Sequence, residues 1–318
     1  MSAPLPLVVV AETIDPAAVE ELKGGPCRVV VVKGGEAELA PHLPDAWGII
    51  VRSRTKISAD FLARTPHLQL VARAGVGVDN VDVPAATARG VQVVNTPTAA
   101  TASVAELTVG LYLLLARNLF ERIRATKAGE WKRSELGSEL EGKTVGFVGY
   151  GRIAREIARR LQAFRVTTLA HDPFVPTAVD ATELLPLETV LERADFVSLH
   201  AALTPENHHL LNAERIARMR RGAYLVNVAR GALVDEEALL AALESGHLGG
   251  AALDVFETEP PTRQRLLEHP RLLPTPHLGA STHEAQQRAG RFIVGEVLRA
   301  LRGEPLQSLV NPTAGGTR

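Results

Sequence analysis

Cysteine is almost missing from the sequence, which has only Cys27 among 318 residues. A single cysteine cannot form a disulfide within the chain, so a disulfide-stabilised extracellular framework is excluded. This cysteine count fits a reducing compartment. We expect Cys27 to be an inert buried thiol rather than a reactive one.

An excess of one charge is missing too, because the formal net charge is −1. Nucleic acids and anionic membrane surfaces attract clustered positive charge, so neither is predicted as a partner. The apolar run at 111–116 is far too short to cross a bilayer. Residues 1–6 are too few, and lack the basic start, for a signal peptide. We therefore expect a cytoplasmic protein.

What the sequence does contain is a regular alternation of strand and helix patterns. Short apolar runs indicate strands at 7–11, 28–32, 48–51, 69–72 and 92–94, and helical patterns lie between them at 16–22, 58–63 and 84–88. This alternation predicts a parallel sheet with helices on both faces. The pattern breaks at 95–97, and we expect one long helix after it, from residue 101 to 127.

A glycine-rich turn is the most informative feature. It joins a predicted strand at 144–148 to a helical pattern and has the form Gly149-x-Gly151-x-x-Ala154. Gly149 permits a tight turn, Gly151 lets the backbone approach a pyrophosphate, and the helix N-terminus offers N–H groups. A second predicted strand, 166–170, leads to Asp172, which can accept both hydroxyls of a ribose. Its charge would repel a 2′-phosphate, so the turn predicts NAD rather than NADP.

This kind of turn normally follows the first strand of its domain, yet roughly 140 residues precede it here. Further strands are indicated at 195–199, 223–228 and 250–253, and an amphipathic helix at 282–301. We therefore predict two doubly wound parallel-sheet α/β domains. A Rossmann dinucleotide-binding domain at 99–282 would be inserted into a flavodoxin-like substrate-binding domain made of 1–98 and 283–318. A cleft between two such domains would suit a cofactor and a small substrate.

Arg230 and Glu259 lie in segments that follow predicted strands of the second domain, and His277 lies in the segment that comes next along the chain. Arginine can hold a carboxylate through two parallel hydrogen bonds, and histidine can exchange a proton near neutral pH. Glutamate can orient an imidazole and favour its protonated form. Each residue alone could instead be a surface ion pair or a loop residue. Their joint occurrence after the dinucleotide turn favours catalysis, and no metal site is predicted.

These motifs, in this order, resemble the D-isomer-specific 2-hydroxyacid dehydrogenase family. The segments that carry the likeness are 51–56, 73–82, 95–97, 103–107, 149–153, 226–231, 254–260, 276–282 and 310–312. The resemblance implies hydride transfer between NAD and a small 2-hydroxy acid, in a homodimer. It also implies that Arg230 binds the substrate carboxylate and that His277, paired with Glu259, is the acid/base.

The same resemblance implies the cofactor contacts. Besides Gly149, Gly151 and Asp172, it assigns Arg152 and Ile153 to the pyrophosphate. The residues implied at the nicotinamide end are Val76, Val228, Ala229, Asp254, Leu278, Gly279 and Ala280.

Within the family, segments 52–54 and 73–79 are similar to those of members that oxidise D-3-phosphoglycerate with NAD to 3-phosphohydroxypyruvate, the first step of serine biosynthesis. A phosphorylated 2-hydroxy acid carries a carboxylate and a phosphate, so a nearly neutral protein needs a local cationic cluster to hold it. Arg52 and Arg54 are two apart in an extended segment and so leave it on one face. We expect Arg54 to bind the phosphate. The other expected substrate contacts are Arg52, Ser53, Arg73, Gly75, Val76, Gly77, Arg230 and His277.

Several alternatives stay open. Lys132 and Arg133 are further candidates for binding the substrate, in this case across a subunit interface. Alternatively, all these cationic side chains are solvated surface residues. A glyoxylate or hydroxypyruvate reductase would share the catalytic residues but need less positive charge, and an NAD-sensing corepressor of this fold could also keep them. The residues after 302 are too few and too glycine-rich for another domain, so we expect no inhibition by serine.

Overall fold

The computed structural model describes residues 4–33, 35–131, 133–134 and 136–311. The chain divides into two compact units, which we call unit 1 (residues 1–100 and 280–318) and unit 2 (residues 101–279). It passes between them at Ala100–Thr101 and at Gly279–Ala280. The crossings predicted from the sequence, at 98–99 and 282–283, lie two to three residues away. Unit 1 is thus built from two separate stretches of chain, and unit 2 from one.

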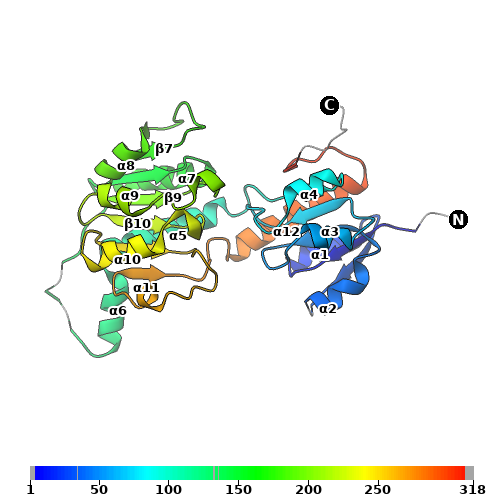
Figure 1. The fold of residues 1–318 in the computed structure, drawn as a ribbon, viewed down its shortest axis with the longest axis horizontal. Helices are drawn as coiled ribbons and strands as arrows, with labels where there is room; N and C mark the ends of the chain where they lie inside the picture. Colours follow the sequence, from blue (N-terminus) through cyan, green and yellow to red (C-terminus); the bar gives the residue numbers. More distant parts are fainter. Residues whose placement is uncertain (1–3, 34, 132, 135, 312–318) are drawn as a thin grey trace. The chain divides into compact units, whose positions relative to one another are not determined.

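Unit 1 is organised around a five-stranded parallel sheet with the order β2-β1-β3-β4-β5, which confirms the predicted flavodoxin-like arrangement (Figure 1). The strands are β1 (Leu7–Val10), β2 (Arg28–Val31), β3 (Ala46–Val51), β4 (Leu70–Arg73) and β5 (Gln92–Val94). Successive side chains of β1 enter opposite cores: Val9 packs on one face of the sheet and Val8 on the other. Because both faces are covered, the central strands β1 and β3 are apolar throughout.

Helices cover both faces of this sheet. On one face α3 (Ala59–Ala63) and α4 (Val83–Ala88) contribute to the core, and on the other α1 (Pro16–Lys23) and α12 (His283–Leu301) do so. A single turn, α2 (Glu36–Leu39), runs into η1 (Ala40–His42). The helix α12 packs closely on the N-terminus of α1. Gly290 permits this approach, because a Cβ added there would lie 2.8 Å from Cβ of Asp15, the residue that caps α1.

The segment 308–311 closes one edge of the sheet in unit 1. Leu309 forms an antiparallel bridge with Val94 of β5, and the Val310 N–H donates to the Val93 carbonyl at 2.7 Å. The buried Asn311 side chain accepts from the Val93 N–H at 2.8 Å, across 218 positions of sequence. The backbone groups of the edge strand are thereby satisfied.

Unit 2 contains a seven-stranded parallel sheet with the order β12-β11-β10-β9-β6-β7-β8. The strands are β6 (Thr144–Val148), β7 (Thr167–His171), β8 (Glu183–Leu184), β9 (Phe196–Leu199), β10 (Tyr224–Asn227), β11 (Gly250–Leu253) and β12 (Leu272–Pro274). The strand order reverses between β6 and β9, as in a Rossmann sheet, so the predicted α/β class is confirmed for both units.

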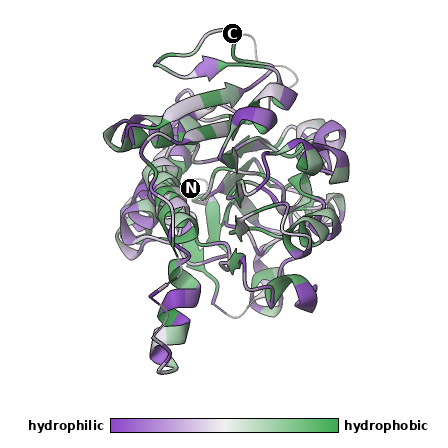
Figure 2. Ribbon diagram, turned by 90° about the vertical axis from the view of Figure 1, so that its left-hand side faces the viewer, coloured by the Kyte–Doolittle hydropathy of each residue, from purple (hydrophilic) through white to green (hydrophobic). Residues whose placement is uncertain are grey.

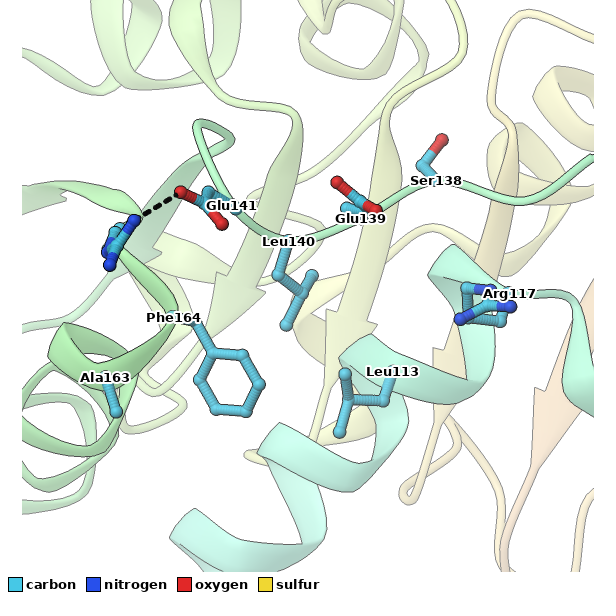
Figure 3. A pocket seen from close by; sticks show the side chains of 9 residues that line it. Leu113, Arg117, Ser138, Glu139, Leu140, Glu141, Ala163 and Phe164 are labelled. Atoms are coloured by element: carbon cyan, nitrogen blue, oxygen red, sulfur yellow. Dashed lines mark hydrogen bonds and ion pairs between the residues drawn. The ribbon is translucent and has the colours of Figure 1, made fainter.

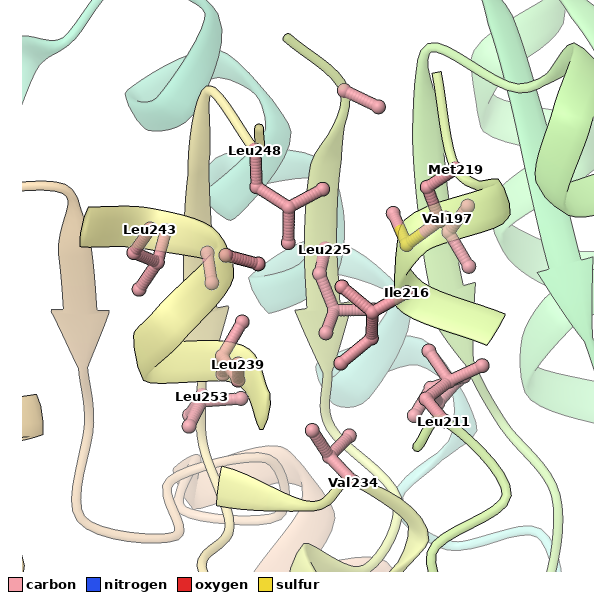
Figure 4. Packing of buried hydrophobic residues seen from close by; sticks show 14 of the residues in the cluster. Val197, Leu211, Ile216, Met219, Leu225, Val234, Leu239, Leu243, Leu248 and Leu253 are labelled. Carbon is pink, nitrogen blue, oxygen red and sulfur yellow. The ribbon is translucent and has the colours of Figure 1, made fainter. Parts of the chain in front are cut away.

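Two hydrophobic cores flank this second sheet. One joins the strands to α5 (Thr101–Ala116) and α7 (Arg152–Leu161), and the other joins them to α8 (Leu187–Arg193), α9 (Ala213–Arg218) and α10 (Glu236–Glu244). Figure 4 shows the second core, where Ile216 of α9 and Leu239 of α10 pack around Leu225 of β10. Figure 2, which is coloured by hydropathy, shows strands that are largely hydrophobic and helices that carry hydrophilic segments. The remaining helices of the described part of unit 2 are α6 (Leu119–Lys127), η2 (Gln162–Phe164), η3 (Pro205–Asn207), η4 (Gly231–Leu233) and α11 (Gln264–Leu267).

The single long helix expected from 101 to 127 is wrong. Two helices occupy this region, α5 and α6 (Leu119–Lys127), with an angle of 67° between them. The break lies at Asn118, whose φ of +46° belongs to the left-handed region that asparagine tolerates better than most residues. Among the described residues no single helix could span a membrane, and only the bent pair α5–α6 passes that test together, by length and composition alone.

Candidate active site

The glycine-rich turn between β6 and α7 lies where the strand order of unit 2 reverses, which is where open α/β sheets bind ligands. Gly149 has a φ of +89°. A Cβ added there would lie 2.6 Å from the backbone nitrogen of Ala201, so the turn requires glycine. A Cβ added to Gly151 would meet nothing within 4 Å, so the space beside this residue is open.

The N-terminus of α7 can receive an anion. Its N-cap residue is Gly151, and within the described part of the chain no side chain caps it. The first N–H groups of the helix and its dipole therefore favour a negatively charged group. Arg152 and Ile153 begin this helix, the former exposed and the latter half-buried. These features fit the pyrophosphate of a dinucleotide.

Asp172 follows β7 and reaches back to the glycine-rich turn. Its Oδ2 accepts from the Tyr150 N–H at 2.8 Å, and its Oδ1 accepts from the Phe174 N–H at 2.9 Å. The side chain is partly exposed, and each carboxylate oxygen has a second acceptor site. The group can therefore still accept ribose hydroxyls, and the residues at this turn fit NAD.

Arg230 follows β10 in a turn that the buried Asn227 fixes. The Asn227 side chain accepts from the Ala229 N–H at 3.0 Å and donates to the Arg230 carbonyl at 2.8 Å. A Cβ added to the next residue, Gly231, would lie 1.8 Å from the carbonyl carbon of Phe256. Glycine is therefore what allows the Arg230 turn to pack against the loop that carries Glu259.

Glu259 and His277 form a pair on two different loops of unit 2. Nδ1 of His277 lies 2.9 Å from Oε2 of Glu259, while Oε1 of Glu259 accepts from the Phe256 N–H at 3.2 Å. The side chains are 53% and 40% exposed for His277 and Glu259, so both are accessible to a ligand. A carboxylate with both oxygens engaged has a fixed orientation, and it fixes the imidazole in turn.

The buried Asp254 organises the turn that carries His277. Its Oδ1 accepts from the Thr275 hydroxyl at 2.6 Å and from the Leu278 N–H at 2.7 Å, and its Oδ2 accepts from the Gly279 N–H at 2.8 Å. His277 itself has a φ of +54°, a left-handed conformation that costs free energy for any residue other than glycine. The bonds from Asp254 hold the turn in this conformation, so the histidine ring is presented by a strained backbone.

A second pair of glutamates, Glu236 and Glu257, stabilises the loop that carries Glu259. The Glu236 N–H donates to Glu257 Oε1 at 3.0 Å, and the Glu257 N–H donates to Glu236 Oε1 at 2.8 Å. Nε of Arg263 lies 3.2 Å from Oε2 of Glu236. Burial raises the pKa of Glu236, although the hydrogen bond from Glu257 and the charge of Arg263 oppose the shift. These contacts fix the segment two residues before Glu259.

In unit 1 the candidate cations lie on a loop that a buried carboxylate holds. Oε1 of Glu12 accepts from the N–H groups of Arg52 at 3.0 Å and Thr55 at 2.9 Å, and its Oε2 accepts from the Arg54 N–H at 3.3 Å. Burial alone would raise the pKa of Glu12, but these backbone hydrogen bonds lower it overall. The Arg54 side chain is 81% exposed, whereas Glu12 is 4% exposed.

The carbonyl side of this loop is held as well. Nδ2 of Asn80 donates to the carbonyls of Arg52 at 2.9 Å and Thr55 at 2.7 Å. Arg73 ends β4, and its guanidinium lies over Gly75, where an added Cβ would overlap it at 1.4 Å. The exposed Val76 is held through its carbonyl, which accepts from Nδ2 of Asn95 at 2.6 Å. The backbones of the 52–55 loop and of the segment after Arg73 are therefore held in place by hydrogen bonds.

The predicted site residues fall into two groups. Unit 2 brings together the glycine-rich turn with Asp172, and the three loops that carry the catalytic candidates. The other predicted residues that belong to unit 2 are Val228, Ala229, Leu278 and Gly279. Those that belong to unit 1 are Arg52, Ser53, Arg54, Arg73, Gly75, Val76, Gly77 and Ala280. Arg133 is exposed, and Lys132 lies outside the described residues.

Two hollows of unit 2 are lined by none of these residues. The larger, of about 450 Å³, is open to solvent and is shown in Figure 3, where Leu113, Leu140 and Phe164 lie among polar side chains such as Arg117 and Glu139. The smaller, of about 260 Å³, lies beside β7 and includes Asp180. Neither contains an arrangement that resembles the catalytic one.

Three positioning groups were not found from the sequence. Glu12 and Asn80 hold the Arg52–Arg54 loop, and Tyr150 joins the glycine-rich turn to the segment after Asp172. Asp254 was predicted as a cofactor contact, and its described contacts are to the His277 turn. For Glu12, the one signal available in the sequence was an acidic residue directly after a predicted strand.

The comparisons with known proteins agree with this geometry. A model of the NAD-binding domain of D-isomer-specific 2-hydroxyacid dehydrogenases matches residues 109–279. The chain is 46% identical over 316 residues to the D-3-phosphoglycerate dehydrogenase of Mycobacterium leprae, covering 98% of this chain and 60% of the relative. It is 43% identical over 312 residues to the human protein of the same name, covering 96% and 58%.

Among solved structures, a glyoxylate reductase from Paecilomyes thermophila superposes with a TM-score of 0.89 at 30% identity, over 97% of this chain and 99% of that one. The chain thus spans about 60% of the length of its curated relatives but the full length of this structural neighbour. On the family match, the fold and the glycine-rich turn together, the chain belongs to the D-isomer-specific 2-hydroxyacid dehydrogenases, and its residues 109–279 are the NAD-binding domain of that family.

Proposed function

We propose that the protein oxidises D-3-phosphoglycerate to 3-phosphohydroxypyruvate with NAD, as the first step of serine biosynthesis. The observation that carries this proposal is the likeness, at 43% and 46% identity over nearly the whole chain, to proteins named D-3-phosphoglycerate dehydrogenase. The fixed cationic loop at 52–54 supports it, because a phosphorylated acid needs positive charge besides the carboxylate-binding arginine.

Each catalytic candidate has one role in this reaction. Arg230 binds the substrate carboxylate, which positions the C2 hydrogen for transfer. His277 takes the proton of the C2 hydroxyl, and Glu259 stabilises the imidazolium that results. NAD, when bound, supplies the hydride acceptor. The protein contributes positioning and one proton transfer.

The substrate phosphate is bound by side chains rather than by backbone groups. The N–H groups of Arg52, Arg54 and Thr55 already donate to Glu12 and cannot also form an anion-binding nest. The guanidinium of Arg54 is exposed and is therefore our principal candidate. Arg52 lies two residues before it in the sequence, and Arg73 is paired with Val51 of the neighbouring strand β3. Unit 1 is accordingly the substrate-binding domain and unit 2 the dinucleotide-binding domain.

A second candidate function is the reduction of glyoxylate or hydroxypyruvate. The structural likeness to a glyoxylate reductase at 30% identity favours it. This activity needs the same three catalytic residues and less positive charge. Turnover of phosphorylated and unphosphorylated 2-hydroxy acids, compared under the same conditions, separates the two functions.

We further propose that the protein is a cytoplasmic homodimer. Four large apolar side chains are between 47% and 93% exposed on α6 and the segment after it: Phe120, Ile123, Trp131 and Leu136. Clustered exposed apolar residues are typical of interfaces, and a second copy of the chain would cover them. Light scattering at micromolar concentration should then give twice the chain mass of 34.1 kDa.

The test of the catalytic proposal is a His277→Ala variant assayed with NAD and a panel of D-2-hydroxy acids. The wild-type protein should prefer D-3-phosphoglycerate, and kcat of the variant should fall about 100-fold or more, because an acid/base group is lost. Its Kd for NAD should stay within about twofold. Wild-type kcat in the variant would show that His277 is not the acid/base. A preference of the wild-type protein for glycolate or D-glycerate, the hydroxy acids that correspond to glyoxylate and hydroxypyruvate, would favour the second candidate function instead.

A further inference from the structure

The dinucleotide motif leaves the position of Tyr150 unspecified, yet Tyr150 is one of the most buried side chains of unit 2, with 0% exposure. Its ring lies 6.3 Å from that of Phe147, and the guanidinium of Arg155 lies 5.4 Å from its centroid. Nε of Arg155 also donates to the Tyr150 carbonyl at 3.0 Å. The tyrosine is therefore fixed on the α7 side of the turn.

Tyr150 is bonded to both ends of the segment 172–180. At one end its backbone N–H donates to Oδ2 of Asp172 at 2.8 Å. At the other end its hydroxyl donates to Oδ1 of Asp180 at 2.5 Å, and lies 3.0 Å from Oγ1 of Thr182. Parts of the segment between are exposed to solvent, with Phe174 90% and Val179 71% exposed, while Val175 and Ala178 pack against a hydrophobic core of unit 2.

The Asp180 end is tied to the sheet. Oδ1 of Asp180 also accepts from the Thr182 N–H at 2.9 Å, and Thr182 shares a hydrogen bond of 2.9 Å with Thr168 of β7. Burial and then the bond to Asp180 raise the pKa of Tyr150 to about 12. Burial alone would raise the pKa of Asp180, but the hydrogen bonds from Tyr150 and Thr182 lower it overall. At neutral pH the contact is therefore a phenol donating to a carboxylate, which is a strong hydrogen bond.

We propose that Tyr150 is a positioning residue for cofactor selection: its hydroxyl holds Asp180 and its N–H holds Asp172, so that the Asp172 carboxylate stays where it accepts the ribose hydroxyls of NAD and repels the 2′-phosphate of NADP. This inference rests on the role given to Asp172, not on the substrate. Loss of the hydroxyl breaks the link between Tyr150 and Asp180, so Asp180 is left with its hydrogen bond from the Thr182 N–H. The Asp172 carboxylate is then positioned only by its two backbone hydrogen bonds, from Tyr150 and Phe174, and is held less rigidly.

The test measures binding rather than turnover. The Kd values for NAD and NADP are determined by calorimetry on the full chain, for wild type, Tyr150→Phe, Asp180→Asn and Asp172→Ser. In the first two variants the Kd for NAD should rise about threefold to tenfold, which is the net value of about one ordinary hydrogen bond, because a less firmly held Asp172 binds the ribose hydroxyls less well, while the Kd for NADP changes less. The preference for NAD therefore narrows in both.

Two comparisons distinguish positioning from general destabilisation. Tyr112→Phe removes another fully buried hydroxyl of unit 2, remote in sequence from the 172–180 segment, and should leave the ratio of the two Kd values unchanged. In the double variant Asp172→Ser/Tyr150→Phe, loss of the tyrosine hydroxyl should change the ratio no further, because it acts through Asp172.

Equal weakening of NAD and NADP binding in Tyr150→Phe would overturn the proposal, as would additive effects in the double variant. An unchanged ratio in Asp172→Ser would also overturn it. If Tyr150→Phe does not fold, Asp180→Asn decides the question by the same criterion. None of these outcomes depends on whether D-3-phosphoglycerate is the substrate, so failure of the proposed reaction is detected separately.

Discussion

His277 and Glu259 are joined through Nδ1 and Oε2 at 2.9 Å. A carboxylate only accepts hydrogen bonds, so Nδ1 must carry the hydrogen. The other ring nitrogen, Nε2, is then the atom that can take a proton from a substrate hydroxyl. The tautomer of the histidine is thus set by the loop that carries Glu259.

Glu259→Gln should keep more activity than the loss of His277 does, and should shift the pH profile. A neutral amide stabilises the imidazolium less than a carboxylate, so the acidic limb of the oxidation rate should move to lower pH. The measurement is kcat/KM for the hydroxy acid between pH 5 and 9. A profile that coincides with the wild type would refute this role for Glu259.

Gly231→Ala should lower both activity and stability. The new Cβ would lie 1.8 Å from the Phe256 backbone, so the Arg230 turn and the Glu259 loop must move apart. Overpacking of this kind costs about 1–3 kcal/mol, and we expect kcat to fall by about tenfold or more because positioning is lost. Urea unfolding and steady-state assays measure both effects.

Gly110→Ala is the matched control for that change. Gly110 lies within α5, and a Cβ added there would meet nothing within 4 Å. Alanine is the better helix former by about 0.5–1 kcal/mol, so this variant should be as stable as wild type or more so, with unchanged kcat. If both variants behave alike, the close approach of the two loops is not what requires glycine at 231.

Glu12→Gln should raise KM for the phosphorylated acid without affecting the Kd for NAD. A glutamine side chain has one acceptor oxygen where Glu12 has two, so N–H groups of the 52–55 loop lose partners at about 1–3 kcal/mol each. Released from its anchor, the loop should bind phosphate less well, and KM should rise about tenfold while kcat changes less. An unchanged KM for the phosphorylated acid would exclude this loop from the substrate site.

His200 should make the folded protein sensitive to acid. Desolvation lowers its pKa from 6.5 to about 3, so the unfolded chain binds a proton more readily than the folded one between these values. The free energy of unfolding therefore falls as the pH falls below 6.5, by about 2 kcal/mol from this residue at pH 5.0.

Urea unfolding of wild type and His200→Gln at pH 7.5 and pH 5.0 checks this contribution. Glutamine can still bond to Ser198, whose Oγ lies 2.8 Å from Nε2 of His200, but it does not titrate. The loss of stability on acidification should be smaller in the variant by about the same 2 kcal/mol. Equal losses in the two proteins would show that His200 does not carry the effect.

Much of the fold could be predicted because the strands are buried on both faces. Apolar runs such as 7–11 and 250–253 agree with β1 and β11 to within one residue, and the glycine-rich turn marks the start of α7. Two short strands were missed. β8 has only two residues, too few for a pattern to stand out, and the two leucines of β12 are followed directly by Pro274, which reads as a loop signal. The break at Asn118 was missed because a left-handed asparagine leaves the helical pattern of its neighbours intact.

The candidate site, too, could be predicted only in part from the sequence. Residues with strong chemistry, such as Arg230 and His277, were found because their side chains identify a reaction. Residues that act on backbone atoms were missed, because a carboxylate such as that of Glu12, which accepts from a backbone N–H 40 positions away, leaves no local pattern. The functional assignments of the predicted residues stay predictions until variants are measured.

The closing segment of unit 1 affects the order in which the chain becomes folded during its synthesis. Unit 2 is continuous, whereas unit 1 lacks α12 and residues 308–311 until all of unit 2 has been made. At about 5–20 residues per second, the ribosome needs roughly 10–40 s to bridge that interval. During it the sheet face that contains Val8 and Val10 has no α12 to cover it. We therefore expect aggregation of the nascent chain to begin from this uncovered face of unit 1.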